Sequence, residues 1–289
     1  MRRRSLVLVL MGLAPLTALA QTPPTDAVSE AHGLHVLSEI KGLDFTLYDN
    51  PLPKALGAVQ DRSECANYVI RPVSAAGRLV AARGWAVTGE AVLGEYRVVS
   101  FAGKFEWGTS AHCIVDQGNI GIFNGTELVA LAYAPRGSKQ SIGKIVALDG
   151  GGLRVWDGDI VSAPVGDIQM QGELLRLGAL ATEDSFCHGK VLVPNIYSLP
   201  INKARKILID KGWKPMASKP VSDPEVFARE ANFAKHGIVE VDSCSGTGYA
   251  FCAFIYKGPG GRLSVTTAGE GDADKDTPAV VDYDVRCRQ

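Results

Sequence analysis

Short β-prone runs, about ten residues apart and separated by Gly, Asp and Asn, dominate the chain as far as Ala181. No helical period of useful length interrupts them between Ala66 and Ala181. This pattern predicts a mainly β protein whose residues 34–183 form an all-β barrel or sandwich, with a hairpin loop at Asp149–Gly152. The predicted strands are Tyr68–Val73, Tyr96–Phe101, Asn119–Phe123, Leu128–Tyr133, Lys144–Leu148 and Leu153–Trp156.

The pattern changes after Cys187, which predicts a smaller α+β domain over residues 184–289. Ile201–Lys211 carries apolar residues at helical spacing, and Gly212 follows where a helix C-cap belongs. Asp223 and Pro224 supply an N-cap and first-turn proline for a second helix ending near Gly237. The predicted strands of this domain are Val191–Pro194, Ile238–Asp242, Tyr249–Tyr256, Arg262–Thr267 and Val280–Val285.

Residues 191–213 of this second domain resemble the opening of a PASTA module. The resemblance rests on Val193-Pro194-Asn195-Ile196, on the helix residues Ala204 and Leu208, and on Lys211-Gly212-Trp213. It implies a strand followed by a helix that ends at glycine. Because some PASTA modules bind cell-wall muropeptides, the resemblance also implies peptidoglycan as a ligand.

The N-terminus has the composition of an export signal. Arg2–Arg4 form a positive region, Leu6–Leu19 are almost wholly apolar, and Ala18-Leu19-Ala20 fits the small-x-small cleavage pattern. We therefore expect a signal peptide at 1–20, a flexible leader at 21–33, and a periplasmic or secreted protein without stable membrane insertion. Cleavage removes three arginines and no acidic residue, so the net charge falls from −1 to −4. That balance argues against nucleic acid as a partner.

All six cysteines follow the predicted signal peptide. An even number in an oxidising compartment indicates a disulfide framework, although spacing alone leaves several pairings open. We expect Cys65–Cys113 in the first domain, with Cys187–Cys287 and Cys244–Cys252 in the second. Each pair then closes within one predicted domain.

Three side chains are candidates for catalysis: His112, Asp157 and Asp159. The segment around His112 resembles the histidine segment of trypsin-like serine proteases, and the segment from Gly158 to Ser162 resembles their serine motif. Two residues separate Asp159 from Ser162, however, and the oxyanion-loop glycines are absent. The two carboxylates beside Trp156 suit sugar recognition, or else an Asp-Gly turn with the indole packed against it.

One segment of the sequence partly matches a metal-binding motif. Asp272, Asp274 and Asp276 imitate the start of an EF-hand loop, but Thr277 and Tyr283 stand where glycine and glutamate are needed. We interpret the segment as a solvated acidic turn and predict neither a metal nor a cofactor.

With no complete catalytic constellation in view, we expect a non-enzymatic binding or inhibitor-like protein that acts on an envelope protein partner. Its contact loop would lie between Cys244 and Cys252, with Ser245, Thr247 and Tyr249 as the contacting residues. The alternatives are a peptidoglycan-binding module and a hydrolase with an unrecognised site.

Overall fold

The computed structural model describes residues 33–56, 63–108, 112–218, 223, 226–246, 248–271, 273 and 277–288. The chain from Gly33 onward forms one compact unit. The predicted signal peptide and all but the last residue of the predicted leader lie outside the described residues. Within the described ranges, no helix has both the length and the apolar character needed to cross a membrane.

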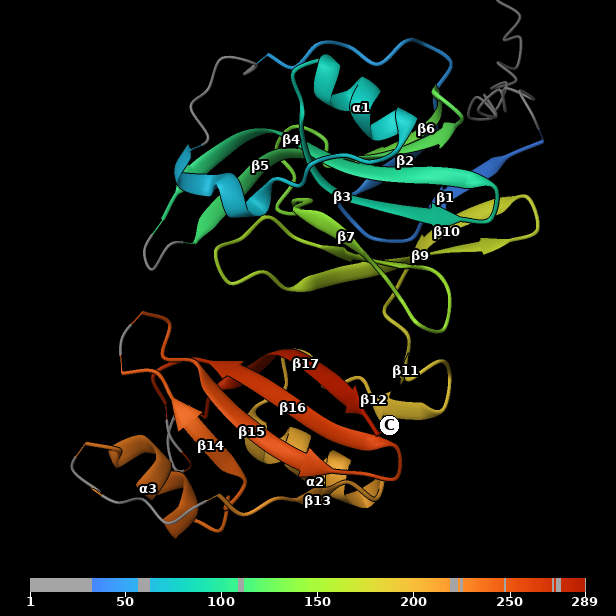
Figure 1. Cartoon of the computed structure of the whole chain (residues 1–289). Coiled ribbons are helices and arrows are strands. Elements are labelled where there is room, and N and C mark those ends of the chain that lie inside the picture. The colour runs from blue at the N-terminus through green and yellow to red at the C-terminus, as the bar shows by residue number, and fades with distance from the viewer. Residues whose placement is uncertain are drawn as a thin grey trace, which may run out of the picture. The chain divides into compact units, whose positions relative to one another are not determined.

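Residues 33–182, here called the N-terminal lobe, contain two β-sheets (Figure 1). In the first sheet, all neighbouring strands are antiparallel. Its order is β2 (Asp44–Leu47), β6 (Glu127–Tyr133), β5 (Cys113–Asn124), β4 (Tyr96–Trp107) and β3 (Ala86–Leu93). In the second sheet, β1 pairs with its neighbour in parallel. Its order is β1 (His35–Ser38), β10 (Leu174–Gly178), β9 (Pro164–Gln171), β8 (Leu153–Trp156) and β7 (Lys144–Ala147).

The two sheets bury their facing sides against each other. Val98 and Ile120 of the first sheet share one apolar core with Leu153 and Ile168 of the second. Alternating residues of a strand point to opposite faces, so the inward positions of each strand supply this core. The lobe is therefore a sandwich, and the mainly β fold class is confirmed.

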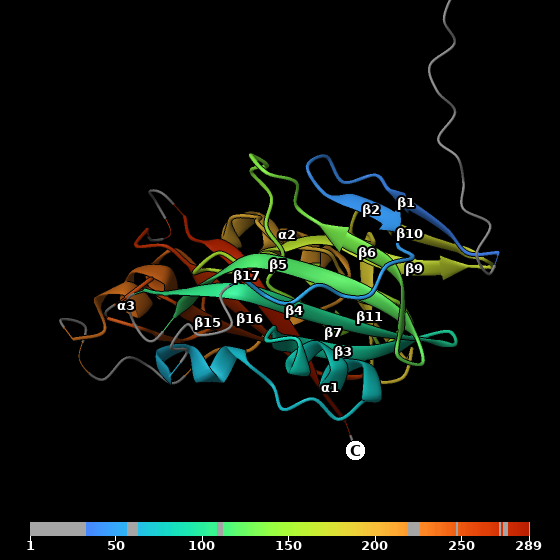
Figure 2. The same ribbon diagram turned by 90° about the horizontal axis from the view of Figure 1, so that it is seen from above.

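One helix, α1 (Ala75–Ala82), covers the outer face of the first sheet (Figures 1 and 2). Ser74 caps it by accepting a 2.9 Å hydrogen bond from the Gly77 N–H. Val80 packs on Phe101 and thereby buries the outer face of β4. The expectation that no helix would interrupt the β-runs was wrong at this segment.

The predicted strand Tyr68–Val73 is also wrong. A 3₁₀ helix, η1 (Ser63–Tyr68), occupies its first residue, and irregular chain follows. Two constraints explain the difference. Pro72 has no N–H to give to a sheet, and the Cys65–Cys113 disulfide fixes η1 against β5.

Residues 183–288, the C-terminal lobe, build one larger sheet and a hairpin. The hairpin pairs β11 (Glu183–Phe186) with β12 (Val191–Pro194). Two helices flank the sheet, α2 (Ile201–Asp210) and α3 (Ala228–Lys235). A fifth strand of the sheet, β14 (Val241–Cys244), pairs with the strand Cys252–Lys257 outside the main strand order. The sheet has the order β13 (Lys214–Pro215), β15 (Cys252–Lys257), β16 (Gly261–Ala268) and β17 (Ala279–Cys287).

The β12–α2 unit has the strand–helix form that the sequence predicted, and Gly212 adopts a positive φ of 86° just after α2. The second helix begins later than predicted, because Asp223 accepts a hydrogen bond from the Val226 N–H in a turn before α3. The next two strands also start later than predicted, at Val241 and Cys252.

The cysteines form the three pairs expected from the sequence, Cys65–Cys113, Cys187–Cys287 and Cys244–Cys252. Each lobe also has its own apolar core, with no buried residue shared between the two. The described chain is nevertheless one compact unit, so two independent domains stay a prediction.

A buried charge network joins the lobes. Arg154 on β8 donates from Nε and Nη2 to Asp167 on β9, at 2.9 and 3.1 Å. It also donates to both oxygens of Asp184 on β11, at 2.6 and 2.7 Å. The hydroxyl of Tyr283 on β17 donates to Asp184 at 2.5 Å. Moving β8 away from the C-terminal lobe would leave these buried charges without their partners, which is costly. The network therefore fixes β8 relative to that lobe.

Candidate functional site

A cleft of about 700 Å³ lies beside the buried network and is lined by both lobes. The N-terminal lobe contributes most of the lining, and the C-terminal lobe adds Phe251 just before β15, Thr266 of β16, and Val281 and Asp282 of β17. Aromatic rings and carboxylates dominate its chemistry, with a single lysine among them. The aromatic, acidic and basic side chains concerned are Tyr68, Trp156, Phe251, Asp157, Asp159, Asp282 and Lys144, together with His112.

Strand pairing brings the central side chains together. Lys144 opens β7 and Trp156 closes β8, and the two residues are direct partners across the antiparallel pair. On the other wall, Asp282 of β17 is the partner of Thr266 on β16. Both of these face the cleft because directly opposed residues in a ladder point to the same side of a sheet.

Asp157 shapes the turn that follows β8. Its Oδ1 accepts hydrogen bonds from the N–H groups of Asp159 at 3.1 Å and Ala163 at 3.0 Å. Burial raises the pKa of this carboxyl above its ordinary value, and the two N–H donors oppose that rise. The turn packs closely, because a Cβ placed on Gly143 would come within 2.1 Å of the Asp157 carbonyl oxygen.

Trp156 presents an unmet donor. Its indole Nε1 is shielded from solvent and has no hydrogen-bond partner among the residues that the structure describes. One side of the indole meets Tyr197 edge-on with 5.5 Å between ring centroids, and Lys144 Nζ lies 5.6 Å from the ring centroid. A buried N–H without an acceptor costs about 1–3 kcal/mol. An ordered water or a carbonyl oxygen of a ligand supplies such an acceptor, whereas an ammonium or guanidinium group does not.

On the opposite wall, partial burial raises the pKa of the Asp282 carboxyl. The N–H of Tyr283 and the positive charge of Lys144 oppose this rise. Solvent reaches the Asp282 side chain through the cleft, which limits the rise. The carboxyl group of Asp282 therefore opens onto the cleft, where a cation can reach it.

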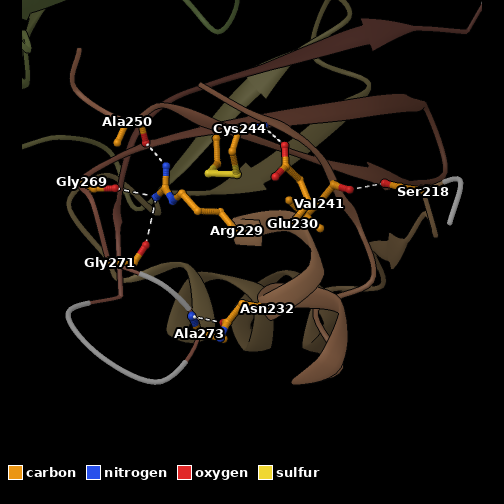
Figure 3. Close-up of a disulfide and its surroundings, with 11 residues drawn as sticks. Ser218, Arg229, Glu230, Asn232, Val241, Cys244, Ala250, Gly269, Gly271 and Ala273 are labelled. Atoms are coloured by element: carbon orange, nitrogen blue, oxygen red, sulfur yellow. Dashed lines mark hydrogen bonds between the residues drawn. A yellow bond between two sulfur atoms is a disulfide. The ribbon is translucent and has the colours of Figure 1, made fainter. Parts of the chain in front are cut away.

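Helix α3 holds the chain on both sides of the Cys244–Cys252 loop (Figure 3). The Arg229 guanidinium donates to the carbonyl oxygens of Ala250, Gly269 and Gly271, at 2.7–2.9 Å. Glu230 accepts a 2.7 Å hydrogen bond from the N–H of Cys244, beside the Cys244–Cys252 disulfide. Residues on both sides of the loop are thus fixed to one helix.

The loop predicted to contact a partner packs in part against its own chain. The Tyr249 ring meets His112 edge-on at 6.0 Å between centroids, and Phe251 stacks on His112 at 5.9 Å. The rings of Tyr249 and Phe251 also contact each other, with 6.2 Å between centroids. Ser245 closes the loop by donating its N–H to the Phe251 carbonyl at 2.6 Å. Thr247 lies outside the described residues. The roles predicted for Ser245, Thr247 and Tyr249 stay predictions.

The three catalytic candidates, His112, Asp157 and Asp159, all line the cleft. Their side chains differ in setting: Asp157 is mostly buried in its turn, whereas Asp159 is exposed. The Ser162 hydroxyl donates to the Asp157 carbonyl at 2.8 Å, so it is directed to the backbone and not to a base. The protease-like arrangement of His112 and Ser162 therefore gains no support.

Sequence reasoning missed the role of Lys144, Asp282, Phe251 and Tyr68. Period-two alternation in Val281-Asp282-Tyr283 carried part of the signal, because it places Asp282 and the core residue Tyr283 on opposite faces. No local pattern indicated that β7 and β17 line the same cleft. The three aspartates of the EF-hand-like segment, Asp272, Asp274 and Asp276, lie outside the described residues. Within the described ranges, no cluster of His, Cys, Asp and Glu is arranged to hold a metal.

Comparison with known proteins adds no relative to this picture. No protein-family model, no curated protein and no solved structure matches the chain.

Proposed function

We propose that this protein is an exported binding protein whose cleft takes a cationic group from an envelope protein partner. The observation that carries the proposal is the lining of the cleft. Among the described lining residues there are three carboxyl groups, those of Asp157, Asp159 and Asp282, and one ammonium group, that of Lys144. A cleft with this excess of negative charge attracts cations and repels anions.

The aromatic lining narrows the ligand further. Trp156, Tyr68 and Phe251 give the cleft flat apolar surfaces beside its carboxylates. A lysine or arginine side chain satisfies both features, because its stem packs on rings while its charged end meets a carboxylate. We therefore propose a basic peptide segment of a partner protein as the ligand.

The predicted export signal and the three disulfides support a periplasmic or secreted location for this binding. If the protein acts as an inhibitor, the loop between Cys244 and Cys252 supplies a second contact with the partner. Tyr249 then has to leave His112 before it enters the partner's cleft. Binding through the cleft requires no such rearrangement.

Calorimetric titration of the mature protein with two matched peptides tests the proposal. The probes are acetyl-trilysine amide and acetyl-trinorleucine amide, which share length and stem but differ in charge. We expect trilysine alone to bind, and Asp157→Asn combined with Asp282→Asn to weaken it about tenfold or more. The control is Asp44→Asn combined with Asp116→Asn, which removes the same charge from residues outside the lining. Equal affinity for the two peptides would rule the proposal out.

A hydrolase is the second candidate, and one observation favours it. His112 lies more than forty residues before Asp157 and Asp159 in the sequence, yet all three line one cleft, where burial raises the pKa of Asp157. A carboxyl that stays protonated at higher pH suits a general acid. Turnover of a glycoside or peptide substrate that disappears in Asp157→Asn would replace the binding proposal with this one.

Peptidoglycan binding remains a proposal that rests on the PASTA-like residues 191–213. None of these residues lines the cleft. Retention of the mature protein on purified sacculi, unchanged by cleft substitutions and lost on substitution within α2, is the result that would favour it.

A further inference from the structure

Lys144 occupies a distinctive position in the cleft. Its Nζ lies 5.6 Å from the centroid of the Trp156 ring, within the range of a cation–π contact. Across the cleft, the positive charge of Lys144 acts on Asp282 and opposes the rise in its pKa. An ammonium group of the protein itself thus lies over an aromatic face, in a cleft whose lining also includes the carboxyl group of Asp282.

Lys144 is held there weakly. Within the described part of the chain it forms no ion pair and no side-chain hydrogen bond, in contrast to Lys211, which pairs with Glu183 at 2.7 Å. It is exposed and belongs to a strand at the edge of its sheet. A lysine side chain, with its flexible four-carbon stem, can leave such a position without breaking any buried contact.

We infer that the space over Trp156 is a cation-binding position that Lys144 fills and yields to the ammonium or guanidinium group of the ligand. This inference rests on the proposed function and adds to it the place where the cation binds. Lys144 then acts as an internal competitor. Lys144 thereby lowers the affinity of the cleft for weakly basic or singly charged ligands, because each ligand has to displace a cation of equal charge.

The test measures binding of acetyl-trilysine amide to Lys144→Met, which keeps the stem length and removes the charge. We expect this variant to bind about three- to tenfold more tightly than the wild type, the range of a partly desolvated cation–π contact. Lys203→Met is the matched control, because Lys203 is exposed on α2 and outside the cleft lining. It should bind as the wild type does.

Removing a positive charge also strengthens the general field of the cleft, so a second comparison is needed. In a Trp156→Leu background, the gain from Lys144→Met should fall to less than twofold, because the ring that both cations share is gone. If Trp156→Leu does not fold, as judged by circular dichroism, the gain is measured instead at about 0.5 M salt, where long-range fields are screened and a contact at the ring persists.

The outcomes separate the two ideas. A Lys144→Met affinity equal to or below that of Lys203→Met overturns the inference, while trilysine binding by the wild type keeps the proposed function. A gain that persists in full without Trp156, or that vanishes in salt, also overturns it in favour of a general charge effect. Failure of every variant to bind trilysine removes the proposed function and the inference together.

Discussion

Arg154 and Trp156 lie two residues apart on β8, on the same face of the strand, and both contact Tyr197 of the C-terminal lobe. They differ in how completely their polar groups are satisfied. All three guanidinium nitrogens of Arg154 donate to buried carboxylates. Among the described residues, the indole N–H of Trp156 has no acceptor. The same face of β8 thus carries Arg154, whose donors are all satisfied, and Trp156, whose donor is not.

The contrast separates a structural role from a functional one. A fully satisfied buried network rigidifies its surroundings, and the pairing of Arg154 with Asp167 and Asp184 holds the lobes in register. An unmet donor next to a buried carboxylate with a raised pKa reduces stability, and such residues are expected at binding sites. The first region should therefore respond to substitution with a loss of stability, and the second with a loss of binding.

The largest effect is expected from Arg154→Met. The substitution leaves Asp167 and Asp184 buried without their cation, so we expect the free energy of unfolding to fall by about 3–5 kcal/mol. Urea denaturation followed by circular dichroism measures this change. The matched control is Arg176→Met, which breaks the solvent-exposed pair with Glu39 and should cost no more than about 1 kcal/mol. Equal losses for the two variants would mean that the Arg154 network does not hold the lobes.

A pair of tryptophan substitutions gives the next effect. Trp156→Phe and Trp85→Phe remove the same indole N–H, but that of Trp85 donates to the Pro53 carbonyl at 2.8 Å. We expect Trp85→Phe to lose about 1 kcal/mol more than Trp156→Phe, because only the former leaves a hydrogen bond broken. Denaturant midpoints of the two variants test this. If Trp156→Phe is the more destabilising, its N–H is satisfied in solution and the contrast on β8 fails.

The smallest effect concerns Asp157 and pH. Its folded-state pKa is raised above the unfolded value, so the folded state binds the proton more tightly. The resulting destabilisation is absent below the unfolded pKa near 3.8, grows as pH rises to the folded pKa, and is complete above it. Asp157→Asn removes the charge and keeps an oxygen to accept both turn hydrogen bonds. We expect its Tm at pH 7 to exceed that of the wild type by about 1–3 °C.

The difference in Tm should shrink toward zero when both proteins are heated at about pH 3. Thermal unfolding across this pH range is the measurement. A constant difference at every pH would assign the gain to packing and not to ionisation.

Where strands and turns were signalled locally, the sequence was sufficient to predict them. The hairpin of β7 and β8 follows from two apolar runs around Asp149–Gly152, and the helix α2 follows from its apolar spacing and Gly212. The disulfide pairs were also predicted correctly, because each closes within one lobe. Helix α1 was missed although Ser74 supplied an N-cap, since eight residues with an interior glycine give little periodic signal.

The cleft was only partly predictable. His112, Asp157 and Asp159 stand out as residue types beside Trp156 or Cys113, and these neighbours are visible in the sequence. Lys144 and Asp282 acquire meaning only from tertiary packing, because more than a hundred residues separate them along the chain. The same holds for Arg154, whose two acidic partners lie on different strands of different sheets.

The most direct test of the account follows the indole N–H signals of ¹⁵N-labelled mature protein by NMR during titration with acetyl-trilysine amide. The chain has four tryptophans, and the Trp156 signal is assigned by its loss in Trp156→Phe. We expect the Trp156 signal to shift most, with Trp85 unaffected because its N–H is already bonded. A shift confined to the exposed Trp107, or no shift at all on saturation, would contradict the claim that this cleft binds the cation.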